Sequence, residues 1–150
     1  MALSPEPSAS ARRSLEHWAL LGGTLLAATA VIVLGSWIQP DPRGYGTHEQ
    51  LGMDPCRFLA WTRIPCPGCG VTTSVALTAR GEFAAAFWNQ PFGVIAAVLA
   101  PLAAIVSVVQ HARGRDLGAT LRAVRPGWWG IALALAAAGS WIWKIVAMRG

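Results

Sequence analysis

The stretch WALLGGTLLAATAVIVLGSWI, from Trp18 to Ile38, runs for 21 positions without a charged residue. As an α-helix it would be roughly 31 Å long, close to the hydrocarbon thickness of a bilayer. The apolar run continues well past Ala28-Thr29-Ala30, which resembles the cleavage site of a signal peptide. We therefore expect an uncleaved membrane span here rather than a removable leader.

Two more apolar runs follow the same pattern. Residues 92–110 carry no charge and contain Pro101, where we expect a kink in the helix. Residues 128–148 contain one charge, Lys144, which lies close enough to the end of the run for its side chain to reach the lipid–water interface. Together with residues 18–38, these runs predict an all-α integral membrane protein with about three transmembrane helices.

Composition supports a membrane location. Hydrophobic residues make up 54% of the chain and charged residues only 13%, about half the charged share of a soluble domain. Eight tryptophans are present, and several flank the apolar runs, as aromatic residues at membrane interfaces do. The net charge of +5 is not accompanied by a nucleic-acid-binding motif or an aromatic-basic face. We expect the lipid bilayer as a partner, and no nucleic acid.

The remaining segments complete the predicted organisation. Residues 1–17 are rich in Ser, Ala and Pro and predict a flexible N-terminal tail, and residues 18–150 predict a single membrane domain. The loop 39–91 holds pieces that are too short and too charged to cross a bilayer separately. We expect them to form short interfacial helices packed against the spans.

Small residues recur at helical spacing in two of the predicted spans. Ala96, Ala100 and Ala104 form one stripe, and Ala132, Ala136 and Ser140 form the other. Such stripes allow helices to approach closely, so they predict contacts between spans and a possible membrane-protein partner.

The distribution of arginines predicts the orientation. The segment 110–127 has a net charge of +3, whereas the loop 39–91 is neutral. Positive charges favour the cytoplasmic side, which also places Arg12 and Arg13 there, although Lys144 and Arg149 would lie outside. We expect a multi-pass protein of the bacterial cytoplasmic (inner) membrane, with a cytoplasmic N-terminus and loop 39–91 on the non-cytoplasmic face.

Two of the three cysteines lie in a Cys66-Pro67-Gly68-Cys69 turn. Proline and glycine at its two central positions suit a type II β-turn, which brings the two thiols together. A helix is expected to begin after Gly70, so that Cys69 lies near its amino end, where the helix dipole favours a thiolate.

The chain around this turn carries a longer pattern. Residues 66–73 read Cys-Pro-Gly-Cys-Gly-Val-Thr-Thr, followed by Gly81-Glu82, an Ala-Phe run at 84–87 and Asn89-Gln90-Pro91. This pattern resembles an uncharacterised family of small bacterial membrane proteins, a domain of unknown function, whose hallmark is Cys-Pro-x-Cys-Gly-x-Thr followed by Arg or Thr. The resemblance covers about residues 47–111 and implies a membrane fold without an established activity. Many relatives carry Arg at the position of Thr73.

Three interpretations of the cysteines remain open. The turn can be a structural or ligand-holding element of a small accessory membrane protein. Alternatively, Cys66 and Cys69 can be the catalytic pair of a membrane thiol–disulfide oxidoreductase, assisted by Cys56. In the third interpretation, His48, Cys56, Cys66 and Cys69 form a Cys₃His set that binds a structural zinc ion.

Other polar residues near the turn are candidates for binding or assisting roles. Thr72, Thr73 and Asn89 follow the cysteines, although helix capping and turn formation explain such residues equally well. The predicted spans carry no central charge of the kind that marks an ion path, so a transporter is not expected.

Overall fold

The computed structural model describes residues 13–124 and 126–149. Most of the predicted tail 1–17, together with Arg12 and Arg125 of the orientation argument, lies outside the described residues. Within them, three long helices are apolar enough to cross a membrane: α1 (Leu15–Trp37), α5 (Pro91–Ala112) and α7 (Pro126–Ala147). The described residues contain no strand. The predicted fold class is confirmed, and the chain is a multi-pass membrane protein.

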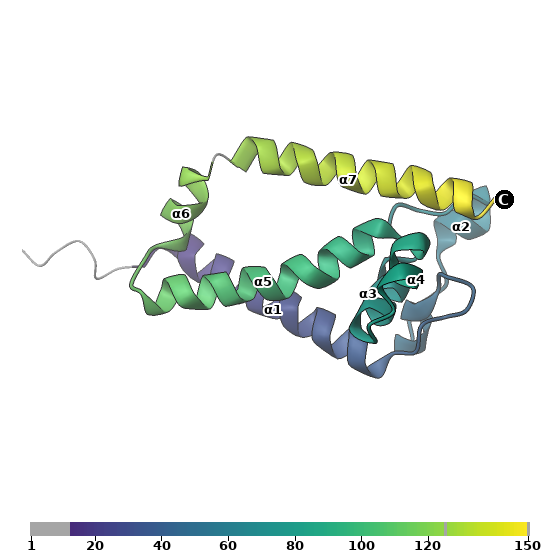
Figure 1. Ribbon diagram of the computed structural model, residues 1–150, viewed down its shortest axis with the longest axis horizontal. Coiled ribbons are helices and arrows are strands. Elements are labelled where there is room, and N and C mark those ends of the chain that lie inside the picture. The colour runs from purple at the N-terminus through teal and green to yellow at the C-terminus, as the bar shows by residue number, and fades with distance from the viewer. Residues whose placement is uncertain (1–12, 125, 150) are drawn as a thin grey trace, which may run out of the picture.

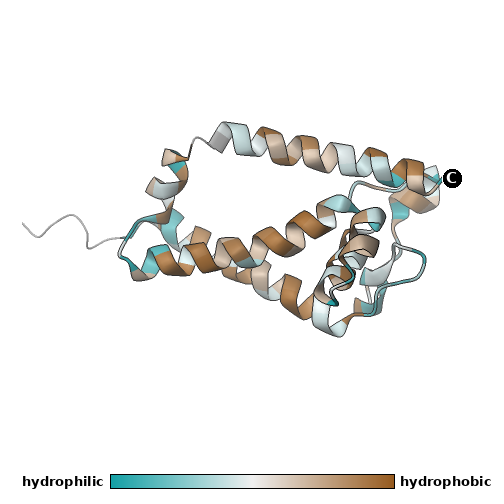
Figure 2. Cartoon of the chain, viewed as in Figure 1, coloured by the Kyte–Doolittle hydropathy of each residue, from teal (hydrophilic) through white to brown (hydrophobic). Residues whose placement is uncertain are grey.

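Short helices occupy the two ends of the long ones (Figure 1). Four of them lie between α1 and α5: η2 (Thr47–Leu51), α2 (Arg57–Thr62), α3 (Val71–Ala79) and α4 (Phe83–Asn89). The hydropathy colouring is brown along the spans and teal in the loops at both ends (Figure 2). The helix α3 begins directly after Gly70, as the sequence predicts, and ends just before Arg80-Gly81.

The helix α6 (Leu117–Ala123), between α5 and α7, is an element that the sequence interpretation missed. Asp116 precedes it, and its side chain accepts a hydrogen bond from the backbone N–H of Ala119 at 2.9 Å. This is an N-cap, so a capping signal was present in the sequence. The net positive charge of the segment 110–127 alone does not indicate a helix.

Glycines allow α3 to dock closely against two spans. A Cβ atom on Gly35 of α1 would lie 2.4 Å from the Cβ of Ala79, and one on Gly93 of α5 would lie 2.6 Å from the Cβ of Ser74. No larger residue fits either position without moving a helix. Of the predicted stripe on α5, Ala104 is buried within the chain, whereas Ala96 and Ala100 are half-buried.

Arg80 holds the C-terminal end of α1, where the loop 39–91 begins. Its guanidinium donates to the backbone carbonyls of Gly35 at 3.2 Å and Ile38 at 2.9 Å. Carbonyls at the C-terminus of a helix lack partners within the helix, so this side chain satisfies them. The loop that follows therefore starts from a fixed point.

The opposite end of the molecule is joined by a histidine pair. His17 of α1 is completely buried, and its Nε2 lies 3.0 Å from Nδ1 of His111 on α5. The backbone N–H of Leu117 donates to Nδ1 of His17 at 3.1 Å, which attaches α6 to the same point. Arg122 and Glu16 form an ion pair nearby. These contacts hold α1, α5 and α6 together far from the cysteines (Figure 1).

Candidate metal centre

The turn between Cys66 and Cys69 forms, but its geometry differs from the prediction. The backbone N–H of Cys69 donates to the carbonyl of Cys66 at 2.9 Å. Gly68 does not have the positive φ that a type II turn needs at its third position, so that part of the prediction is wrong. The left-handed residue is instead Gly70, with φ of 90°, which is also the N-cap of α3. The turn therefore leads directly into the helix.

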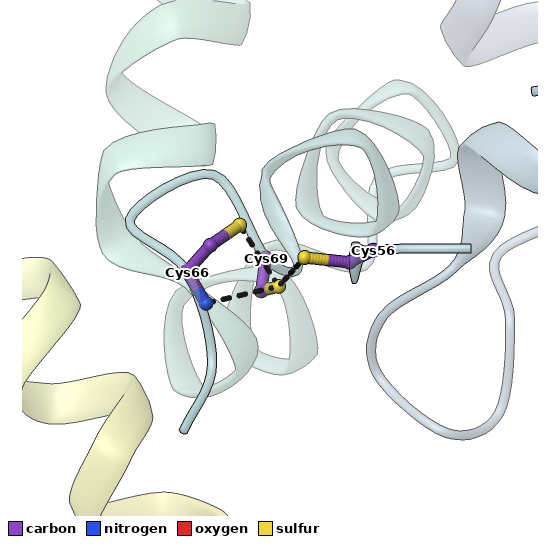
Figure 3. A group of neighbouring side chains, drawn as sticks. All are labelled: Cys56, Cys66 and Cys69. Carbon is purple, nitrogen blue, oxygen red and sulfur yellow. Dashed lines mark hydrogen bonds between the residues drawn. The ribbon is translucent and has the colours of Figure 1, made fainter. Parts of the chain in front are cut away.

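The turn brings three sulfur atoms together (Figure 3). The Sγ of Cys69 lies 3.0 Å from that of Cys66 and 3.5 Å from that of Cys56. All three Sγ atoms lie within 4.8 Å of one another, and the three cysteines are free. Cys56 comes from a separate segment, where it precedes α2. Folding thus adds a third thiol to the pair that the sequence motif defines.

The three thiols differ in their environments. Burial raises the pKa of the Cys69 thiol well above its usual range, and its hydrogen bond with Cys66 acts in the same direction. This contradicts the expected thiolate at the amino end of α3, because desolvation outweighs the helix dipole. Burial also raises the pKa of Cys56, but hydrogen bonds from the Leu59 backbone and from the other two thiols outweigh it and lower the pKa overall.

These pKa directions predict an order of alkylation. In the reduced, metal-free protein at neutral pH, Cys56 should react with a maleimide about tenfold faster than Cys69, because the thiolate is the nucleophile. Peptide mass spectrometry after timed quenching measures both rates. In denaturant the difference should vanish, and a faster reaction of Cys69 in the folded protein would contradict the prediction.

Two cavities adjoin the sulfur atoms. The larger has a volume of about 680 Å³ and is lined by the three cysteines together with His48, Met53 and Phe92, among others. The smaller, of about 150 Å³, is also lined by His48, Cys56 and Cys69. His48 therefore lies beside the cluster, but its ring nitrogens fall outside the 4.8 Å group. All three cysteines line the larger cavity, and Cys56 and Cys69 also line the smaller one.

The predicted assisting residues have separate places. Thr72 lines the larger cavity. Thr73 is buried, and its hydroxyl lies 2.8 Å from that of Thr47, which joins α3 to η2. Asn89 donates from Nδ2 to the carbonyl of Gly70 at 3.0 Å and to the hydroxyl of Ser74 at 2.9 Å. Asn89 therefore holds the backbone immediately after Cys69.

Lys144 joins the hydrogen bonds made by Asn89. The sequence interpretation did not predict this position for Lys144. The residue is 3% exposed, and Nζ donates to the Gly44 carbonyl at 2.9 Å and to Oδ1 of Asn89 at 2.7 Å. Among the described residues, no Asp or Glu forms an ion pair with it. A buried ionisable residue near the end of a span, bonded to the loop that carries the site, is a candidate for a functional role.

The same end of α7 holds the cysteine turn directly. Trp141 donates from Nε1 to the carbonyl of Pro65 at 2.7 Å. Ser140 donates to Oε1 of Gln90 at 2.7 Å and accepts from the backbone N–H of Phe92 at 2.9 Å. Ser140, one end of the second small-residue stripe, is therefore engaged within the chain.

The fold and the site define a small three-span membrane protein with a thiol cluster at one end of its helices. Residues 56–104 match the model of a protein family of unknown function, DUF2752. This confirms the resemblance to a domain of unknown function. The matched residues include all three cysteines, whereas His48 and Lys144 lie outside them. No curated protein and no solved structure matches the chain.

Proposed function

We propose that this protein binds a thiophilic metal ion, such as zinc, through Cys56, Cys66 and Cys69. The observation that carries the proposal is the convergence of three Sγ atoms within 4.8 Å from two separate segments. Free thiols packed in a core need no such convergence, and soft sulfur ligands select zinc, copper(I) or iron–sulfur clusters.

The spacing of the sulfurs suits a metal ion. Zn–S bonds of about 2.3 Å at tetrahedral angles place two sulfur ligands roughly 3.8 Å apart. The Cys66–Cys69 and Cys56–Cys69 distances of 3.0 and 3.5 Å are somewhat shorter. Insertion of an ion therefore requires the side chains to spread by less than about 1 Å. For a four-ligand zinc site, His48, which lines both cavities, is a candidate for the remaining position.

Lys144 supports the binding of an anionic complex. Three thiolates around Zn²⁺ carry one net negative charge, which is costly to bury without a partner. A Cβ atom on Gly70, the residue after Cys69, would lie 3.1 Å from Nζ of Lys144. The ammonium group therefore lies beside the residue that follows Cys69, while its own hydrogen-bond partners are neutral.

The experiment is a metal analysis of the full-length protein purified in detergent. We expect about one equivalent of metal per chain, and its loss in Cys66→Ser and Cys69→Ser. Thr73→Ser, a conservative change at a buried hydroxyl outside the cluster, is the matched control and should retain the metal. A metal-free wild-type protein that also fails to bind added zinc after reduction would refute the proposal.

The short segment 110–127, with a net charge of +3 against the neutral loop 39–91, supports an orientation within this proposal, although Lys144 and Arg149 lie at the cysteine end. Arg13, Arg113, Arg115 and Arg122 lie at the end of the molecule that carries α6, opposite the cysteines. The positive-inside tendency then places the N-terminus in the cytoplasm and the metal site on the outer side of a bacterial inner membrane.

Reporter fusions test this orientation. A fusion at Gly114, between α5 and α6, should report a cytoplasmic location, and one at Gly52, after η2, a non-cytoplasmic location. Alkaline phosphatase and a cytoplasm-active fluorescent protein at each site give paired readouts. If Gly114 were non-cytoplasmic and Gly52 cytoplasmic, the orientation would be inverted. The same location for both fusions would contradict the three-span topology.

A second candidate function rests on the 3.0 Å separation of the Cys66 and Cys69 sulfurs. A disulfide bond requires them to approach by only about 1 Å. In such a reaction the two thiols give two electrons and two protons to a disulfide of a partner protein. The partner disulfide becomes two thiols, and Cys66 and Cys69 form a disulfide bond. Alkylation in intact membranes separates the functions: metal-bound thiols become reactive after chelation, whereas a disulfide becomes reactive only after reduction.

A further inference from the structure

The ligand count of the cluster distinguishes between metal ions. Among the described residues, the group of close His, Cys, Asp and Glu donor atoms contains the three cysteines and no fourth member. Structural zinc almost always takes four ligands in a tetrahedron. Copper(I), a soft monovalent ion, is satisfied by thiolate and thioether sulfur without a hard fourth ligand.

A fourth sulfur lies on the approach to the cluster. Met53 lines the larger cavity together with all three cysteines, and it is about half exposed, at 49%. It belongs to the loop between η2 and α2, the segment that also carries Cys56. The cavity therefore offers a thioether at its accessible edge and thiols further in. Thioether sulfur binds copper(I) far better than it binds zinc.

We infer that the ion bound at Cys56, Cys66 and Cys69 is copper(I), and that Met53 contacts it on entry through the larger cavity. This inference rests on the proposed metal-binding function and specifies its ion. On binding, each thiol that coordinates releases its proton, and no electron is transferred, because the ion enters and remains as Cu⁺. His48 lies beside this path but is not a ligand.

The first test determines the coordination. The reduced, metal-free full-length protein in detergent is loaded with Cu⁺ under argon and examined by X-ray absorption. We expect three sulfur ligands and no imidazole nitrogen. His48→Ala should leave the Cu⁺ affinity, measured against a chromophoric chelator, unchanged within about twofold, since a change at a ligand or its support costs about 10- to 100-fold.

The second test concerns the entry path. Met53→Leu should slow the transfer of Cu⁺ from the chelator measurably, because the thioether that first contacts the ion is gone. Met148→Leu is the matched control, because Met148 is exposed at the end of α7 and does not line the cavity. Equal transfer rates in the two variants would remove Met53 from the path.

The outcomes separate this inference from the proposed function. A stable zinc complex with three sulfurs and the His48 imidazole, together with Cu⁺ bound by only two sulfurs, would overturn the copper inference and leave the metal site intact. Failure to bind either ion would overturn both. Copper in preference to zinc in protein purified from cells supplied with both metals would support both.

Discussion

Replacement of Lys144 by methionine should lower both the stability of this protein and its affinity for metal. Methionine keeps an unbranched side chain that is one atom shorter, and it removes the donors to the Gly44 carbonyl and to Oδ1 of Asn89. Buried acceptors left without donors cost about 1–3 kcal/mol, so the thermal midpoint in detergent should fall measurably. Losing the cation beside the thiolates should weaken metal binding by about tenfold or more.

The matched control for this variant is Arg149→Met. Arg149 is exposed beyond the end of α7, and the substitution removes the same unit of charge. It should change neither the thermal midpoint nor the metal affinity. If Lys144→Met lowers the stability while the metal affinity stays the same, Lys144 has only a structural role, and its part in the electrostatic argument is wrong.

The spans could be predicted because the bilayer imposes a simple length requirement. A long uncharged run such as residues 18–38 is unfavourable when exposed to water, so a membrane-spanning helix is the expected structure. The helix Leu15–Trp37 agrees with this run within a few residues. The turn type could not be predicted from Pro67 and Gly68 alone. The left-handed residue is Gly70, the N-cap of α3, where an added Cβ would lie 2.8 Å from the Gly44 carbonyl oxygen and 3.1 Å from Lys144, contacts that the local sequence does not report.

The residues of the site also differ in whether local sequence or tertiary packing brings them together. Cys66 and Cys69 are three residues apart, so a local turn is enough to bring them together. Cys56 reaches them only because its loop folds back over the turn. Lys144 lies at the far end of the sequence, and a charge near the end of a span usually extends to the interface. Its inward direction depends on where α7 meets Gly44 and Asn89, which no periodicity in the sequence reports.

Metal affinity should rise steeply with pH and continue to rise above neutrality. The ion competes with protons for the sulfurs, so each displaced proton adds about a tenfold gain per pH unit. The pKa of Cys69 is raised by burial, so this thiol still carries its proton in the metal-free protein at neutral and mildly alkaline pH. The pKa of Cys56 is lowered, so its proton is lost first and ceases to contribute at a lower pH.

Competition against a chromophoric chelator at pH 6, 7 and 8 measures this dependence, and proton release in weakly buffered solution at pH 7.5 counts the displaced protons. The slope should stay near one proton or more per ion throughout. Cys69→Ser, which should lose its metal during purification, should show in this titration only a weak residual binding with a shallower slope, because the thiol that holds its proton longest is gone. An affinity independent of pH in the wild type would mean that the sulfurs are already thiolates before the ion arrives, and the buried, protonated state of Cys69 would be wrong.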